Sequence, residues 1–192
     1  MGWEGQTVAI QDTDAKRNAI TEAVKLLAET ADACRQAGLD VKIVSCGGTG
    51  TYQHTAYLPG ITELQAGGGI FCDIHYHEHF HVDHDYALTV LATVTSRPTP
   101  TRIICDTGKK TMSSDAAVPK PCIATPVTRV GLSAEHATIE LAEPADTPMV
   151  GDKIEFIVGY TDTTTMLHEE LYATRNGRVE AVWPVLGRGK LR

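Results

Sequence analysis

A long amphipathic helix, followed by a short strand and a glycine-rich turn, most constrains what this chain can fold into. Apolar side chains between residues 14 and 37 recur at steps of four, three, four and three, which predicts one apolar stripe along a helix. Asp12 or Asp14 can cap its start, and Gly38 stands where a left-handed residue often ends a helix. A strand over 41–45 and a turn over 46–51 follow, which predicts an α/β layer with a parallel sheet.

The pattern changes near residues 74–88. A second strand is expected at 61–65, but from about residue 87 onward short strands separated by prolines predominate and no helix is expected. These strands are expected at 87–96, 102–105, 137–141, 153–158 and 179–185. We therefore expect an α/β domain at 1–86 and an antiparallel β domain at 87–192.

The front domain offers about three strands, which are too few to close a barrel. We expect it to be completed by another chain, or to have been separated from an N-terminal segment. Its parallel strands should then leave apolar side chains exposed, and the isolated chain should aggregate or bind a partner.

The composition narrows the classes of partner. A formal charge of −7 with scattered Lys and Arg argues against nucleic acid binding. The sequence contains neither a long apolar run nor a signal-peptide pattern, so no membrane association and a cytoplasmic location are expected. The five cysteines have no CxxC spacing, which favours buried thiols over a zinc or redox site.

The turn after the first strand is the strongest local signal for a ligand. Gly47, Gly48 and Gly50 let the backbone approach closely, and Thr49 and Thr51 add hydroxyl groups. Successive N–H groups of such a turn can converge on one anion, so a phosphate is the expected guest. A tight turn without a ligand remains the alternative.

A run of histidines near the domain boundary is the second signal. In an extended segment His75, His77, His79 and His81 would share one face, where imidazoles could bind zinc or iron. A polar connector between domains explains the same composition. Two polar loops, at 106–115 and 160–165, are either functional loops or solvated turns.

Four segments together resemble one enzyme family, in this order and spacing and over most of the chain. They are VSCGGTGTY, TELQAGGGIFCD, ALTVLATVTSRPTPTRIICDTGKKTMSSD and the ending VEAVWPVLGRGKLR. The chain thus resembles the C-terminal portion of the D-threonine aldolase and D-serine dehydratase-like family. The resemblance implies a partial alanine-racemase-like (β/α) barrel that holds pyridoxal 5'-phosphate, followed by an antiparallel β domain. It also implies a homodimer in the complete enzyme.

The resemblance also implies roles for particular residues. Gly48, Thr49, Gly50 and Thr51 match the turn that holds the cofactor phosphate, with Gly47 as a supporting hinge. Trp3 and Gly5 lie in a GWEG segment that resembles the end of an earlier barrel strand, near the cofactor ring.

Two departures from the family pattern bear on activity. Where the family has His-x-Cys or His-x-Asp for a divalent metal, this chain has Tyr160 and Asp162. A phenol is a poor zinc ligand, whereas a carboxylate with water suits magnesium or manganese, and His168 is a candidate substitute for the missing imidazole. No segment matches the surroundings of the family's Schiff-base lysine, because Lys16 and Lys25 lie on the expected helix and Lys42 opens a strand. We therefore expect that lysine to be absent and this chain alone to be inactive.

The function implied is that of a pyridoxal-phosphate-dependent lyase that cleaves small D-β-hydroxy-amino acids by a retro-aldol reaction. A D-serine or D-3-hydroxyaspartate dehydratase is the first alternative. A non-catalytic remnant or complementing subunit is the second, and a histidine-rich metal-binding protein is the third.

Overall fold

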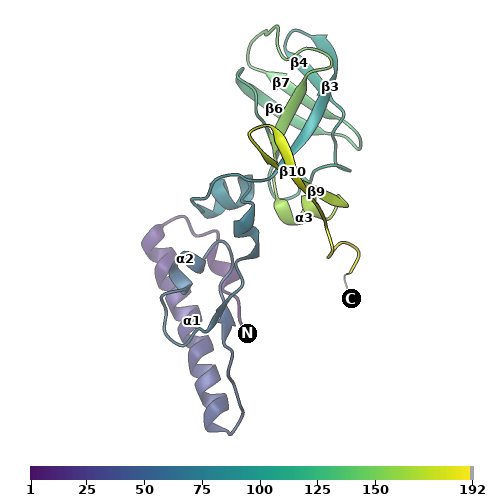
Figure 1. The fold of residues 1–192 in the computed structure, drawn as a ribbon. Coiled ribbons are helices and arrows are strands. Elements are labelled where there is room, and N and C mark those ends of the chain that lie inside the picture. Colours follow the sequence, from purple (N-terminus) through teal and green to yellow (C-terminus); the bar gives the residue numbers. More distant parts are fainter. Residues whose placement is uncertain (191–192) are drawn as a thin grey trace. The chain divides into compact units, whose positions relative to one another are not determined.

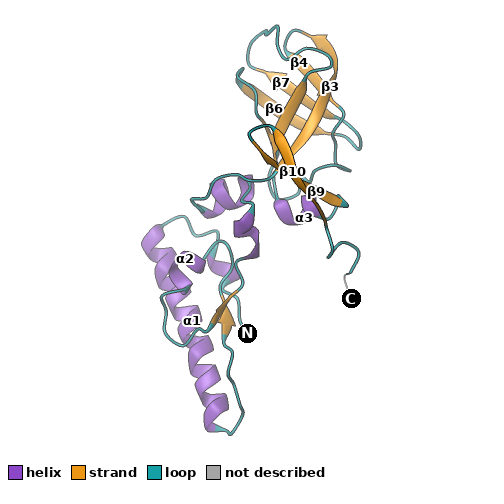
Figure 2. Ribbon diagram, viewed as in Figure 1, coloured by secondary structure: helices purple, strands orange, loops and turns teal. Residues whose placement is uncertain are grey.

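The computed structural model describes residues 1–190, which divide into two compact units. The N-terminal unit comprises Met1–Cys72 and Tyr76–Asp85, and the C-terminal unit comprises Asp73–His75 and the chain from Tyr86 onward. Helices predominate in the first unit and strands in the second (Figure 2). No helix within residues 1–190 is both long and apolar enough to cross a membrane.

The N-terminal unit is built on helix α1, Thr13–Gln36, close to the expected range (Figure 1). Asp12 caps it by accepting a 2.8 Å hydrogen bond from the N–H of Ala15, and Gly38 follows its end with a φ of +85°. The apolar stripe packs a small core, as the periodicity predicts. This core contains Ile20, Val24, Leu27, Cys46, Leu58 and Ile61.

The strands of this unit are parallel, as expected, but shorter than predicted. Strand β1 is Ser45–Cys46 and pairs with β2, Glu63–Leu64. The hydroxyl of Thr62 accepts the N–H of Val44 at 2.8 Å, so a side chain replaces a ladder partner just before β1. Short helices complete the unit: η1 Gly5–Thr7, α2 Tyr52–Thr55, η2 Gly67–Ile70 and, at the boundary between units, η3 His75–His79.

The extended conformation expected for the histidine run is wrong, because His75–His79 form a π-helical turn. Residues two apart in a helix point in different directions, so His77 does not share a face with His75 and His79 as it would in a strand. The start of the run is held by a distant segment, since the N–H of His75 donates to the carbonyl of Gly159 at 3.0 Å.

The C-terminal unit contains a six-stranded antiparallel sheet in the order β5-β8-β3-β4-β7-β6. Figure 1 labels β3, β4, β6 and β7 of this sheet. Strands β4 and β7 have the predicted bounds, whereas β5 and β6 were not anticipated. The strands are β3 Thr89–Thr99, β4 Arg102–Cys105, β5 Lys120–Pro121, β6 Val127–Leu132, β7 Ala137–Leu141 and β8 Lys153–Ile157. Alternate side chains of β3, β4, β7 and β8 form a continuous apolar core around Phe156 and Ile139.

A hairpin and a short helix complete this unit. The hairpin pairs β9, Glu170–Arg175, with β10, Arg178–Pro184. Helix α3, Thr161–Thr165, contradicts the expectation of no helix after residue 87. Its cap lies far away in sequence, because the buried carboxylate of Asp73 accepts both the N–H and the hydroxyl of Thr161, at 2.7 and 2.8 Å.

Candidate functional site

The glycine-rich turn after β1 borders a cavity of the N-terminal unit. The cavity has a volume of about 740 Å³ and opens to solvent, while Thr49 and Thr51 are themselves only 5% and 3% exposed. Thr49, Gly50 and Thr51 form one side, and α1 contributes Lys16 and Arg17. The other principal lining residues are Gln53, His54, Tyr57, Phe80 and His81.

Internal hydrogen bonds set the shape of this turn. Gly47 has a φ of +81°, and its N–H donates to the carboxylate of Glu4 at 3.2 Å. The N–H of Gly48 donates to the hydroxyl of Thr51 at 3.0 Å, so this hydroxyl is itself part of the turn. Within residues 1–190 no protein acceptor meets the N–H groups of Thr49 and Gly50. These two groups belong to residues that line the cavity, where an anion could accept from both.

The Trp3 ring packs against both Gly5 and Gly48, so it connects the GWEG segment to the turn. A Cβ added to Gly5 would lie 2.6 Å from the Trp3 ring, and one added to Gly48 would lie 2.7 Å from its Nε1. Both positions therefore require glycine while Trp3 stays in place. Trp3 and Gly5 thus lie beside Gly48, and Trp3 also borders a separate cavity of about 340 Å³.

Glu4 is the buried charge of this site. Its Oε2 accepts from the Cys46 thiol at 2.9 Å as well as from Gly47, and its Oε1 accepts from the Thr55 hydroxyl at 2.5 Å. Burial opposes ionisation, but hydrogen bonds from Cys46, Thr55 and Thr51 outweigh it, so the pKa of Glu4 lies below its ordinary value. Burial and the neighbouring Glu4 raise the pKa of Cys46 to about 12, so this thiol stays protonated. Sequence patterns gave no signal for Glu4, because a buried carboxylate is identified only by its distant donors.

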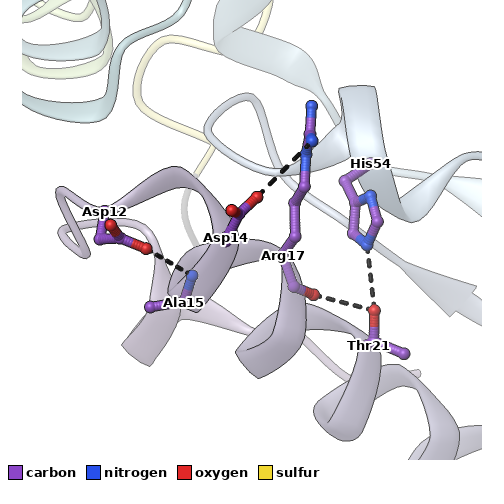
Figure 3. Close-up of polar contacts among 6 residues, drawn as sticks. All are labelled: Asp12, Asp14, Ala15, Arg17, Thr21 and His54. Atoms are coloured by element: carbon purple, nitrogen blue, oxygen red, sulfur yellow. Dashed lines mark hydrogen bonds and ion pairs between the residues drawn. The ribbon is translucent and has the colours of Figure 1, made fainter.

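Two cations face the same cavity from α1. The Nζ of Lys16 donates to the carbonyl of Phe80 at 2.9 Å, and partial burial lowers its pKa. The Arg17 side chain extends away from the helix on the same side as the ring of His54, whose Nε2 meets the Thr21 hydroxyl at 3.0 Å (Figure 3). Basic residues so near a helix N-terminus oppose the helix dipole. That unfavourable placement is the sequence signal that could have made Lys16 and Arg17 candidates for ligand binding.

The predicted metal residues lie together in the C-terminal unit, at the start of α3. The hydroxyl of Tyr160 donates to Asp162 at 2.8 Å, and the Tyr160 ring meets His75 edge-on, with centroids 5.2 Å apart. His168 is turned to another partner, since its Nε2 lies 2.7 Å from the carbonyl of Thr111.

The donor set at Tyr160 and Asp162 does not fit a protein-held zinc ion. Among residues 1–190, no group of three or more His, Cys, Asp and Glu side chains is arranged to hold a metal ion. A phenol and one carboxylate supply too few good ligands for a closed zinc site. Any metal here would be a hydrated ion held mainly by Asp162.

Comparison with known proteins places the chain in a family. Residues 87–174 match the family described as "Putative serine dehydratase domain". The 3-hydroxy-D-aspartate aldolase of Paracoccus denitrificans is 34% identical over 190 residues, which cover 95% of this chain and 48% of that protein. The crystal structure of D-threonine aldolase from Filomicrobium marinum superposes with a TM-score of 0.90 at 27% identity, over 99% of this chain and 53% of that one.

The fold is also that of an alanine-racemase-like protein from Idiomarina loihiensis, with a TM-score of 0.75 at 19% identity over 95% of this chain and 54% of that chain. The architecture is therefore a partial alanine-racemase-like barrel with an antiparallel β domain. The chain belongs to the D-threonine aldolase and D-serine dehydratase-like family and corresponds to the C-terminal part of its members. It spans about half the length of the curated relatives it matches.

Proposed function

We propose that this chain forms the C-terminal part of a pyridoxal-phosphate-dependent lyase that cleaves small D-β-hydroxy-amino acids in a retro-aldol reaction. Residues 1–86 form part of the cofactor-binding barrel in this proposal, and 87–192 form the β domain. The observation that carries it is the cavity beside the turn at residues 47–51. There the N–H groups of Thr49 and Gly50, which have no acceptor within residues 1–190, belong to residues that line the cavity together with Lys16 and Arg17.

The cavity suits a phosphate group for electrostatic reasons. A phosphate monoester carries between one and two negative charges at neutral pH, and backbone N–H groups of a turn with nearby cations are its usual partners. The N–H groups of Thr49 and Gly50 would hold its oxygens, while Lys16 and Arg17 would balance its charge. Gly47 supplies the left-handed hinge, and Trp3 with Gly5 supports the turn from behind Gly48.

Pyridoxal phosphate, when bound, supplies an electron sink for breaking a bond next to the amino-bearing carbon. The residues of this chain orient that cofactor by its phosphate. The amine that anchors its ring is expected outside this chain, since Lys16, Lys25 and Lys42 match no family surroundings. This chain alone is therefore expected to be inactive, and the complete enzyme is expected to be a cytoplasmic homodimer.

The proposed metal position is at Asp162 in the C-terminal unit. Asp162 supplies one carboxylate for magnesium or manganese, and Tyr160 replaces the imidazole that zinc would favour. The Tyr160–Asp162 pair thus also favours the second candidate, a non-catalytic remnant or complementing subunit that binds the cofactor phosphate. A dehydratase acting on D-serine or D-3-hydroxyaspartate remains an alternative reaction at the same site.

A direct test compares the binding of pyridoxal 5'-phosphate and pyridoxal to the full chain by fluorescence titration. We expect the phosphate ester to bind at least about tenfold more tightly, because charge-assisted hydrogen bonds are each worth about 1.5–3 kcal/mol. Lys16→Met should remove much of this preference. The matched control is Lys25→Met, because Lys25 lies exposed on the same helix and pairs with Glu29. Equal binding of the two compounds by the wild-type chain would refute the phosphate site.

A further inference from the structure

A carboxylate lies directly behind the proposed phosphate turn, where simple electrostatics would not place one. Glu4 is only 1% exposed, and it accepts hydrogen bonds from the Gly47 N–H, the Cys46 thiol and the Thr55 hydroxyl. A fixed negative charge beside an anion site repels the anion. Its presence there must be explained by something other than attraction for the ligand.

The hydrogen bonds supply that explanation. By accepting the N–H of Gly47, Glu4 directs this donor toward the protein interior. The next donor, Gly48, is taken by Thr51. The following two N–H groups, on Thr49 and Gly50, have no acceptor within residues 1–190, and both residues line the cavity. The N–H groups of Gly47 and Gly48 thus bond within the protein, whereas those of Thr49 and Gly50 are left for a ligand. The carboxylate of Glu4 holds the first of these four donors in place.

An ionised carboxylate suits this task because all its neighbours here can donate. The Cys46 thiol, whose pKa is about 12, keeps its proton and does not compete as an anion. Thr55 lies on α2, and its hydroxyl bonds Glu4 at 2.5 Å, so Glu4 connects the turn to the helix that follows it. Loss of the carboxylate would leave the Gly47 N–H buried without an acceptor, which is costly.

We infer that Glu4 is a positioning residue that sets the geometry of the phosphate-binding turn through Gly47 and Thr55. This inference rests on the function proposed above. Glu4 does not line the cavity beside the turn, so its effect on a phosphate there is exerted through the turn. It follows that the phosphate of a ligand should sense the change, whereas a ligand without a phosphate should not.

The test measures binding of inorganic phosphate, pyridoxal 5'-phosphate and pyridoxal to the full chain. Glu4→Leu keeps the bulk but removes the acceptor, and should weaken binding of both phosphate compounds at least about tenfold, by loss of a charge-assisted hydrogen bond. Glu4→Gln keeps one acceptor oxygen and removes the repulsive charge, so it should bind phosphate within about threefold of the wild type. Pyridoxal binding should stay unchanged in both variants.

A milder pair of substitutions decides the matter if Glu4→Leu does not fold, as judged by circular dichroism. Thr55→Val removes the 2.5 Å bond to Glu4 and should weaken phosphate binding in the same direction, and Thr55→Ser should restore it.

A wild-type chain that binds no phosphate overturns the proposed function itself. If the wild type binds phosphate but folded Glu4→Leu or Thr55→Val binds it equally well, only the positioning role is overturned. An equal loss of pyridoxal binding would overturn that role too, because it would indicate general disruption.

Discussion

The Tyr160 hydroxyl donates a 2.8 Å hydrogen bond to the carboxylate of Asp162. The bond occupies one oxygen of Asp162, which the family resemblance assigns to a metal. Its donor, Tyr160, stands at the position where the family has histidine. A hydroxyl donor thus stands where a metal ligand would be needed, which makes the pair a specific point of divergence.

Replacing Tyr160 should therefore change metal binding in a predictable way. Tyr160→His should increase zinc affinity about tenfold or more relative to Tyr160→Phe, since imidazole is a good zinc ligand and a phenyl ring is none. Isothermal titration with zinc measures the difference. Tyr160→Phe is the control because it also frees Asp162, and equal zinc affinity in the two variants would contradict a metal site at this position.

Substituting Gly47 should affect both stability and ligand binding. Gly47→Ala places a Cβ at a φ of +81°, which costs about 1 kcal/mol of unfolding free energy, and the Cβ lies 3.0 Å from Leu64 Cδ2. Gly38→Ala is matched in backbone strain, with a φ of +85° and no atom within 4 Å. Both should destabilise the chain similarly in urea, while only Gly47→Ala should weaken phosphate binding. A comparable loss of binding in Gly38→Ala would mean that the effect arises from stability alone.

Glu4 should make the stability of the N-terminal unit depend on pH. Its pKa in the folded protein lies below the ordinary 4.5, so its ionisation stabilises the fold above about that pH, and this contribution is lost as the pH falls through the folded-state value. The unfolding free energy of the wild type should therefore approach that of Glu4→Gln between about pH 6 and about pH 3. Chemical denaturation at a series of pH values measures the difference. A constant difference over that range is the outcome that this account does not allow.

The core of the C-terminal unit should tolerate no cavity at Phe156. This side chain is fully buried on β8, so Phe156→Ala should cost about 3–5 kcal/mol of unfolding free energy. Leu91→Ala on the neighbouring strand β3 should change stability by less than about 0.5 kcal/mol, because Leu91 is 64% exposed. Urea unfolding followed by circular dichroism tests the contrast, which similar losses for both variants would contradict.

Sequence periodicity predicted the elements whose side chains follow a regular pattern. Helix α1 has an uninterrupted apolar stripe with Asp12 and Gly38 at its ends, and β4 and β7 alternate cleanly, so their bounds could be predicted. Helix α3 could not, because its threonine-rich sequence favours no helix and its cap, Asp73, lies 88 residues away in sequence. The shortness of β1 has a similar cause, since the Thr62 side chain takes the hydrogen bond of Val44.

The residues of the candidate site likewise divide into those that the sequence could identify and those that it could not. The turn at residues 47–51 could be singled out from its glycines and hydroxyls, because the signal lies in the residue types themselves. Glu4 could not, since it is distinguished only by its hydrogen-bond partners at the end of β1 and on α2. The exposure expected for apolar residues around the short front strands is mixed, because Ile43 is 62% exposed whereas Val44 is 1% exposed.

The Cys46 thiol gives the N-terminal unit an internal reporter. The thiolate is the nucleophile that attacks alkylating reagents. Cys46 is 3% exposed with a pKa of about 12, so it should react only when its surroundings open. Cys105, fully buried with a pKa of about 11, occupies the equivalent situation in the core of the C-terminal unit, whereas Cys122 lies exposed. Mass spectrometry of the labelled peptides would thus measure the opening rate of each unit separately, without any substitution in the chain. Cys122 would give the rate at which an exposed thiol reacts.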